Sequence, residues 1–190
     1  MKKIFSQLNQ LVKEESKGVH IYYNITDPQA YINNLVAYIQ SGVEQGDNIL
    51  VIESERILPQ IKAELAKVLT GEQLKTIHTI NNFDYYCSSG SFQPAVIFEH
   101  LGKTLEPFIE NNISFRIWAH VEWGEQEGII PILEEFENEA DRVVTEQGMY
   151  LVCAYDKERV PESLETKLMK CHKYTLVNNE IVLSNLYHQD

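Results

Sequence analysis

The triplet Gly102-Lys103-Thr104 is the most catalytic-looking string in this sequence, because a phosphate-binding loop ends in the same residues. That loop needs the pattern GxxxxGK[ST] between a strand and a helix, where its glycines let backbone N–H groups surround the phosphates. Here Ile97 stands where the first glycine would be, and Leu101 and Leu105 flank the triplet at helical spacing. We therefore predict that Lys103 lies on a solvated helix face and that the chain is not a P-loop ATPase.

Histidine and cysteine offer further patterns. His120-x-Glu122 matches one half of a zinc deaminase motif, but the PCxxC half is missing. Cys87, Cys153 and Cys171 are odd in number and form no CxxC, so neither a disulfide framework nor a cysteine zinc site is expected. Cys87 and Cys153 are interpreted as small buried residues, and the Cys171-His172 pair has no visible third group. Since GxGxxG and GxSxG are also absent, no metal and no cofactor are expected.

The elements that would position these residues follow from the apolar pattern. Runs rich in apolar or β-branched residues predict strands, and apolar residues every three or four positions predict helices. The predicted strands are 19–25, 48–53, 77–80, 114–123 and 150–156, followed by a hairpin of 175–177 and 181–183 around Asn178-Asn179. The predicted helices are 4–15, 28 to about 42–46, 57–69, 94–108, 129–143 and about 161–170.

Several local signals refine these elements. Asp27-Pro28 predicts a capped helix start, 81–92 is interpreted as a loop over the sheet edge, and Pro107 is expected to kink or end its helix. Strands and helices alternate, which predicts an α/β fold with a mainly parallel sheet and an antiparallel hairpin at its edge. We expect one domain over 19–190, preceded by an amphipathic helix in 1–18 that either caps the domain or meets a partner.

Composition narrows the classes of partner. The chain has 190 residues, 44% of them apolar, and a net charge of −12 without any cluster of Lys and Arg. That field repels a phosphate polyanion, so no nucleic acid is expected as a partner. The sequence has neither an apolar run long enough to cross a membrane nor the apolar core of a signal peptide, which indicates no membrane association and a cytoplasmic location.

Ligands of open α/β sheets bind just beyond the carboxyl ends of the strands. This rule selects a rim of polar and aromatic residues that suits a small ligand. The rim comprises Tyr23, Asn24 and nearby His20, Glu53, Ser54, Asn81, Asn82, His120, Glu122, Trp123, Tyr155 and Asp156.

Each candidate also has a structural interpretation. His20 could be a hydrogen-bonded core histidine, and Asp156 could cap a helix. Arg116 and Glu122 could take part in structural ion pairs with helix residues, Glu137 being a candidate for Arg116. If His120 and Glu122 both lay in a strand, alternation would place them on one face.

The ordered strings HIYYN, YCSSGSF, RIWAHVEW, LEEFE, VCAYD and HKY resemble the MEDS family, the sensory domain named after a dichloromethane-responsive repressor of methylotrophs and related methanogen proteins. The resemblance runs from about Val19 to Tyr174. It implies a RecA- or KaiC-like three-layer α/β fold that has lost its phosphate loop, and a sensory role for which hydrocarbon derivatives are the suggested ligands. The positions carried over are His20, Tyr23, Tyr86, Gly90, Arg116, Glu122, Trp123, Glu137, Cys153, Tyr155, Asp156 and His172.

We therefore expect a stand-alone, non-enzymatic sensor that binds a small molecule and signals through a protein partner. A homodimer is a further expectation, for which the sequence offers no specific signal. The first rival is a ligand-free interaction module in which the same residues stabilise loops. The second is an enzyme using Glu122 with His120 or His172. The expected ligand contacts are His20, Tyr23, Glu53, Tyr86, Arg116, Glu122, Trp123, Tyr155, Asp156 and His172.

Overall fold

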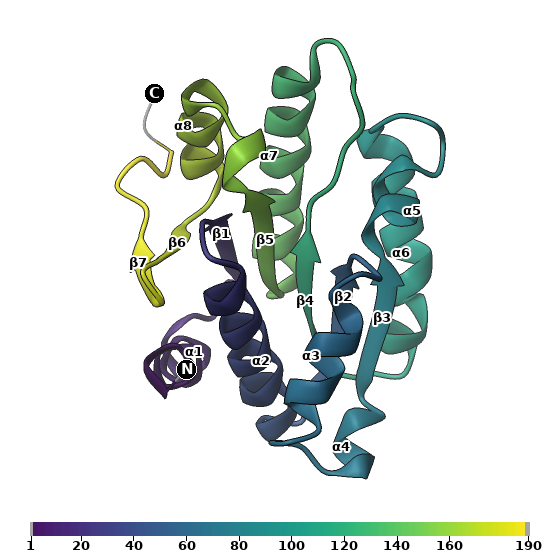
Figure 1. Ribbon diagram of the computed structural model, residues 1–190, viewed down its shortest axis with the longest axis vertical. Helices are drawn as coiled ribbons and strands as arrows, with labels where there is room; N and C mark the ends of the chain where they lie inside the picture. The colour runs from purple at the N-terminus through teal and green to yellow at the C-terminus, as the bar shows by residue number, and fades with distance from the viewer. Residues whose placement is uncertain (1, 189–190) are drawn as a thin grey trace.

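A seven-stranded sheet runs through the middle of residues 2–188, which are the residues that the computed structural model describes (Figure 1). Every neighbouring pair of strands is parallel except the last, β6 and β7, which is antiparallel. This confirms the predicted sheet and its edge hairpin. In spatial order the strands are β3 (Ile77–Asn81), β2 (Asn48–Glu53), β4 (Phe115–His120), β5 (Tyr150–Asp156), β1 (Val19–Ile25), β6 (Tyr174–Val177) and β7 (Glu180–Leu183).

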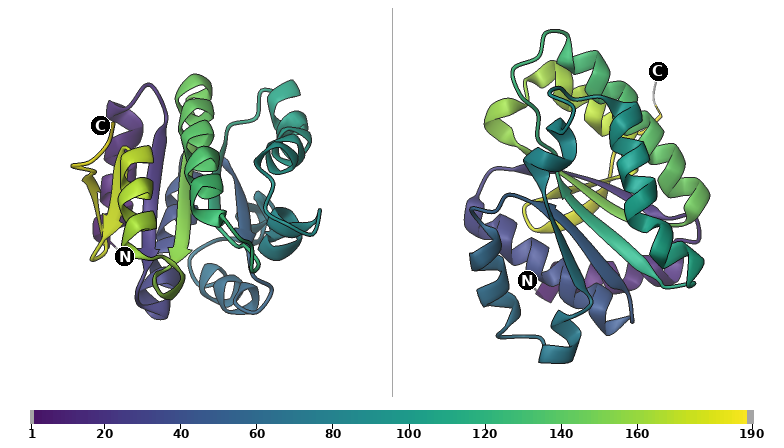
Figure 2. Two further views of the ribbon diagram at one scale, coloured as in Figure 1. Left: turned by 90° about the horizontal axis from the view of Figure 1, so that it is seen from above. Right: turned by 90° about the vertical axis from the view of Figure 1, so that its right-hand side faces the viewer.

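Helices cover both faces of the sheet and make the predicted third layer (Figure 2). One face packs against α1 (Lys2–Glu14), α2 (Pro28–Glu44), α3 (Leu58–Leu65) and α4 (Gly71–Leu74). The other packs against α5 (Asn82–Cys87), α6 (Pro94–Glu110), α7 (Ile129–Gln147) and α8 (Glu162–Cys171), and a 3-10 turn, η1 (Lys157–Arg159), follows β5.

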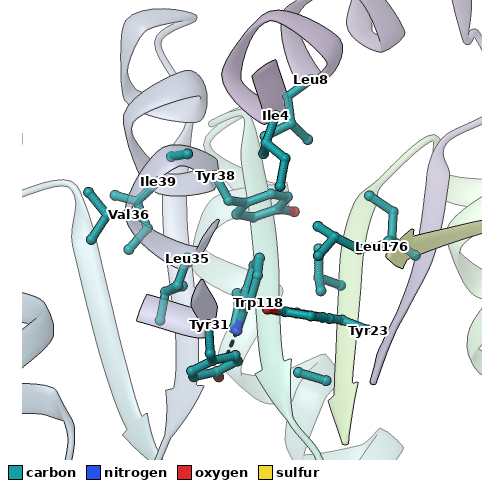
Figure 3. Packing of buried hydrophobic residues seen from close by; sticks show 14 of the residues in the cluster. Ile4, Leu8, Tyr23, Tyr31, Leu35, Val36, Tyr38, Ile39, Trp118 and Leu176 are labelled. Atoms are coloured by element: carbon teal, nitrogen blue, oxygen red, sulfur yellow. Dashed lines mark hydrogen bonds between the residues drawn. The ribbon is translucent and has the colours of Figure 1, made fainter. Parts of the chain in front are cut away.

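The core on the α2 face is centred on Trp118 of β4, which lies between aromatic side chains (Figure 3). Its ring centroid is 5.3 Å from that of Tyr38 and 5.7 Å from that of Tyr31, and its indole N–H donates to the Tyr31 hydroxyl at 2.9 Å. Burying these large rings is strongly stabilising, and the shared hydrogen bond leaves neither polar tip without a partner. The same core buries Ile4 and Leu8 of α1, so the N-terminal helix caps the domain with its apolar side.

Short local signals explain where elements begin and end. Asp27 accepts a hydrogen bond from the Ala30 N–H at 2.6 Å, which confirms the predicted cap. Asn178 and Asn179 have φ angles of 50° and 60°, as a tight hairpin turn requires of both central residues. The helix predicted over 57–69 stops at Leu65 instead, and the chain turns before Thr70 and Gln73 form the capping box that starts α4.

Other boundaries also differ from prediction. Residues 82–87 form α5 rather than loop, because the Asn81 side chain caps the helix by accepting from the Asp84 N–H at 3.0 Å. The strand predicted over 114–123 ends at His120. Beyond Val121 the chain leaves the sheet, held by hydrogen bonds from Arg159. Pro107 lies inside α6, which ends within one turn of it.

The Gly102-Lys103-Thr104 triplet lies in the middle of α6, as predicted. Lys103 is exposed and pairs with Glu99 one turn earlier, with Nζ and Oε1 2.6 Å apart. Its backbone amides belong to the helix, so they cannot wrap a phosphate. Among the helices of residues 2–188, none has the length and apolar character needed to cross a membrane.

Candidate functional site

The carboxyl ends of three adjacent strands bring Glu53, His120 and Asp156 together. His120 Nδ1 lies 2.9 Å from Glu53 Oε1, and His120 Nε2 lies 3.5 Å from Asp156 Oδ1. The Tyr31 hydroxyl, from α2, donates to the other oxygen of Glu53. The Glu53 side chain is fully buried, whereas that of Asp156 is 47% exposed. These residues, called the strand-end cluster below, span the rim from the core to the solvent.

The strand-end cluster carries a histidine cation between carboxylates. Burial alone would lower the pKa of His120, but the hydrogen bonds and charges of Asp156 and Glu53 raise it to about 9. The hydrogen bond with His120 in turn lowers the pKa of Asp156. Burial, reinforced by the Glu53 charge, raises the pKa of Tyr31, so its hydroxyl stays a neutral donor. Asp156 makes no side-chain cap bond to η1, and its carboxylate faces His120 instead.

Glu122 and Trp123 lie beyond the end of β4 and are both held by Arg159. The guanidinium bonds the Glu122 carboxylate and the Trp123 carbonyl, and its carbon lies 4.1 Å from the centre of the Trp123 ring. Because β4 ends at His120, the expected pairing of His120 and Glu122 on one strand face is wrong. The indole is buried and its centroid is 5.9 Å from that of Tyr155.

Arg116 and Tyr23 lie outside the strand-end cluster. Arg116 lies at the amino end of β4, where its buried Nε donates to Asp47 at 2.7 Å. It therefore pairs with Asp47 rather than with Glu137, and does not reach the strand ends. Tyr23 lies beside the strand-end cluster, with its ring centroid 5.7 Å from that of Tyr31 and its hydroxyl accepting from Asn34.

A second polar group lies under α7 and α8 and consists of His20, Glu137, Cys153 and His172, called the buried cluster below. Its members come from β1, α7, β5 and the residue after α8, and all are buried. His20 Nε2 lies 3.4 Å from Glu137 Oε2 and 3.5 Å from Cys153 Sγ. His172 Nε2 lies 3.5 Å from the same Glu137 oxygen. Tyr155, another expected site residue, donates to Glu137 Oε1.

Protonation in the buried cluster is set by burial and by these contacts. Burial and the nearby His20 lower the pKa of His172 to about 4, so its imidazole is neutral. Burial works against the charge on His20, but the facing carboxylates of Asp141 and Glu137 raise its pKa. Burial would raise the pKa of Glu137, yet the facing histidines lower it. Burial beside Glu137 raises the pKa of Cys153, so the thiol is protonated.

An apolar cavity of about 30 Å³ adjoins the buried cluster, between the sheet and α5, α6 and α7. Cys153 belongs to both the buried cluster and the cavity wall. The wall also includes Tyr86, an expected contact residue. Phe98, Leu101 and Val143 in the wall are only partly buried, so the cavity extends toward the surface between α6 and α7.

These features define a class of protein: a three-layer α/β domain with polar strand ends and, at Gly102-Lys103-Thr104, a helix in place of a phosphate loop. The chain belongs to the MEDS family: the model of the methanogen/methylotroph, DcmR sensory domain matches residues 19–173, most of its length. A comparison with curated proteins found no match. The resemblance seen in the short motifs is thereby confirmed, and the sensory character of the family applies to this domain.

The sequence patterns did not point to Tyr31 or Asp141, and they gave little weight to Cys153. Asp141 lies one helical turn after Glu137, so the spacing of the two acids on one helix was the available signal. Tyr31 gave no signal, because nothing in its local pattern shows that its hydroxyl meets Glu53. Cys153 was interpreted as a plain core residue, but its sulfur faces two polar side chains and a cavity.

Proposed function

We propose that this sensory domain detects a small, weakly polar organic molecule, such as a haloalkane or another short hydrocarbon derivative, and that the molecule binds in the cavity between the sheet and α5–α7. The observation that carries the proposal is the composition of the cavity wall, in which aromatic and aliphatic side chains predominate. Its volume of about 30 Å³ is roughly that of one water molecule, so a guest of a few non-hydrogen atoms has to displace side chains of the wall, and a nucleotide is excluded. The wall includes Tyr85, Tyr86, Phe98, Phe136, Met149 and Cys153.

The side chains of the polar rim already bond to one another, which supports placing the ligand in the cavity instead. Glu122 is bound by Arg159, Trp123 lies under the same guanidinium, and Glu53 is bonded to Tyr31 and His120. A rim ligand would have to replace these hydrogen bonds, and breaking the buried ones at Glu53 is costly. An apolar guest in the cavity gains dispersion contacts and breaks no hydrogen bond.

Helix α5 offers a route from the cavity to a signalling protein. Tyr85 and Tyr86 of α5 line the cavity, and Phe83 on the same short helix exposes 56% of its surface. A guest that displaces the two tyrosines would shift α5 as a unit, because the helix has less than two turns. We propose that a partner protein contacts this exposed part of α5.

The proposed role is recognition rather than catalysis. A general base works best with a pKa near the ambient pH, and His120 is held as a cation by a pKa of about 9. Glu122, its expected partner, is bound to Arg159 instead. His172 is fully buried and hydrogen-bonded to the Leu168 carbonyl, where no substrate could reach it without opening the core.

Thermal unfolding in the presence of candidate guests tests the proposal. Dichloromethane, short alkanes and short alcohols should raise the melting temperature of the full chain, because a guest that binds the native state stabilises it by mass action. Ala140→Leu places a larger side chain in the cavity wall and should abolish the shift. Ala63→Leu, an exposed change on α3 of the same size, is the matched control and should leave the shift intact.

If no small guest raises the melting temperature, or if the increase is unchanged in Ala140→Leu, the proposed location is contradicted. A shift abolished by Trp123→Ala but not by Ala140→Leu would move the ligand to the rim. Turnover of a guest by the purified chain would support the enzyme instead.

A further inference from the structure

We infer that the buried cluster is a binding site for a divalent transition metal ion of the zinc type, held by His20 Nε2, His172 Nε2, Cys153 Sγ and one oxygen of Glu137. These donor atoms all lie within 4.8 Å of one another. The inference is independent of the ligand proposed for the neighbouring cavity.

The strongest observation is a pair of acceptor atoms that face each other. His172 Nδ1 lies 2.7 Å from the Leu168 carbonyl oxygen and must donate its proton there, so Nε2 of the neutral ring presents a lone pair. That lone pair lies 3.5 Å from Glu137 Oε2, which is also an acceptor. Among the described side chains, both atoms are buried and lack a hydrogen-bond partner. A cation bonded to both atoms would satisfy them together.

Three of the donor–donor distances fit tetrahedral coordination, and the others are at most 4.8 Å. With metal–ligand bonds of about 2.0–2.3 Å, neighbouring ligands of a tetrahedral zinc lie roughly 3.3–3.8 Å apart. Glu137 Oε2 is 3.4 Å from His20 Nε2 and 3.5 Å from His172 Nε2, and Cys153 Sγ is 3.5 Å from His20 Nε2. Imidazole, thiolate and carboxylate together select zinc or a neighbouring first-row ion over calcium or magnesium.

Outer contacts already orient the ligands as metal sites require. His20 Nδ1 lies 3.2 Å from Asp141 Oδ1, a carboxylate–histidine pair that directs Nε2 inward. The Leu168 carbonyl does the same for His172, and the Tyr155 hydroxyl holds the second oxygen of Glu137. Such partners fix ring orientation and make a ligand more basic.

The charges balance when the metal binds. Cys153 loses its thiol proton and His20 loses the proton on Nε2, while Glu137 is already ionised. Thiolate, carboxylate and two neutral imidazoles around a divalent cation then sum to zero, which avoids a buried net charge. With four protein ligands and no open position, the site is structural rather than catalytic.

Cobalt is the probe that distinguishes this site, because thiolate ligation gives Co²⁺ a charge-transfer absorption that other ligands do not. The untagged full chain is unfolded with chelator, then refolded with or without one equivalent of Co²⁺. We expect one ion bound per chain, the thiolate band, its loss when Zn²⁺ is added, and a higher melting temperature. Refolded wild-type protein without the band or the melting shift overturns the inference by itself.

Variants locate the ion. Cys153→Ser should remove the thiolate band, and Cys171→Ser, a neighbouring buried thiol outside the cluster, should keep it. Asp141→Asn should keep the band but weaken binding about 10–100-fold, as loss of an outer contact does. A band that persists in Cys153→Ser, or disappears in Cys171→Ser, contradicts the assignment. If Cys153→Ser does not fold, the stoichiometry and band of the wild-type chain still decide.

Discussion

The two polar clusters use similar side chains in opposite ways. The strand-end cluster joins Glu53, His120 and Asp156 across neighbouring strand ends, and its one buried atom without a close hydrogen-bond partner, the donor His120 Nε2, still faces an acceptor, Asp156 Oδ1, at 3.5 Å. The buried cluster leaves Glu137 Oε2 and His172 Nε2 without partners, although Glu137 is completely buried. A protonated histidine between carboxylates needs nothing more, whereas lone pairs that face each other need a cation.

That difference supports our proposals that the strand-end cluster stabilises the fold and that the region under α7 and α8 binds ligands. At the rim the side chains act mainly on each other and on the loops. Under α7 and α8, ligand-type atoms converge beside a cavity and share Cys153 with its wall. A guest in the cavity would therefore contact the residue that the inferred metal binds.

Removing the carboxylate of the buried cluster should have the largest effect. Glu137→Gln leaves His20 and its proton with one charged partner fewer in the core, and we expect a loss of about 3 kcal/mol in the free energy of unfolding. Urea denaturation of the chelator-treated chain measures it. Glu135→Gln, on the exposed side of the same helix, should change stability by less than about 0.5 kcal/mol. Equal losses of stability in the two variants would show that the buried Glu137 carboxylate stabilises the fold no more than an exposed one does.

The strand-end cluster should instead appear in the pH dependence of stability. The pKa of His120 rises on folding to about 9, so its contribution is complete below the unfolded pKa of about 6.5 and is lost as the pH rises through 9. Between these limits the wild type should lose about 2 kcal/mol more than His120→Gln, with the partial exposure of Asp156 reducing the effect.

Denaturation midpoints across this pH range provide the measurement. His78→Gln, an exposed histidine of β3, is the control and should follow the wild-type profile. Parallel profiles for the wild type and His120→Gln would show that His120 is not held as a cation.

The Arg159 contacts should have a smaller effect, since this pair is partly exposed. Arg159→Ala removes the ion pair with Glu122 and the cation–π contact with Trp123, for an expected cost of about 1 kcal/mol. Lys157→Ala, in the same 3-10 turn, should cost less than about half of that. A larger effect at Lys157 would mean that these charges stabilise the 3-10 turn rather than the segment around Trp123.

Lys103→Ala should have the smallest effect. The side chain lies on the solvent face of α6 and pairs only with Glu99 among the described residues. We expect no ATP hydrolysis by the wild type and no change on substitution, as followed by phosphate release. Hydrolysis that disappears with Lys103 would restore the phosphate-loop interpretation and overturn the ligand proposal.

Most elements could be predicted because their signals are local. Apolar runs, the Asp27 cap and the paired asparagines of the hairpin act within a few residues of themselves. The predicted boundaries were wrong where a side chain or a distant segment decided them, as with the Asn81 cap of α5 and the Arg159 contacts beyond β4. Of the expected site residues, the strand-end rule correctly grouped Glu53 and Asp156 with His120, because parallel strands end at a common edge.

The sequence by itself determined the alternation of strands and helices, the absence of a phosphate loop around Lys103 and the membership of the MEDS family. Only the tertiary structure decided that His20, Glu137, Cys153 and His172 share one buried point, while Arg116 lies at the opposite end of its strand. Periodicity fixes which face of an element a side chain takes. Which side chains of distant elements meet on that face depends on strand order and helix packing, and these are settled by burial over the whole chain.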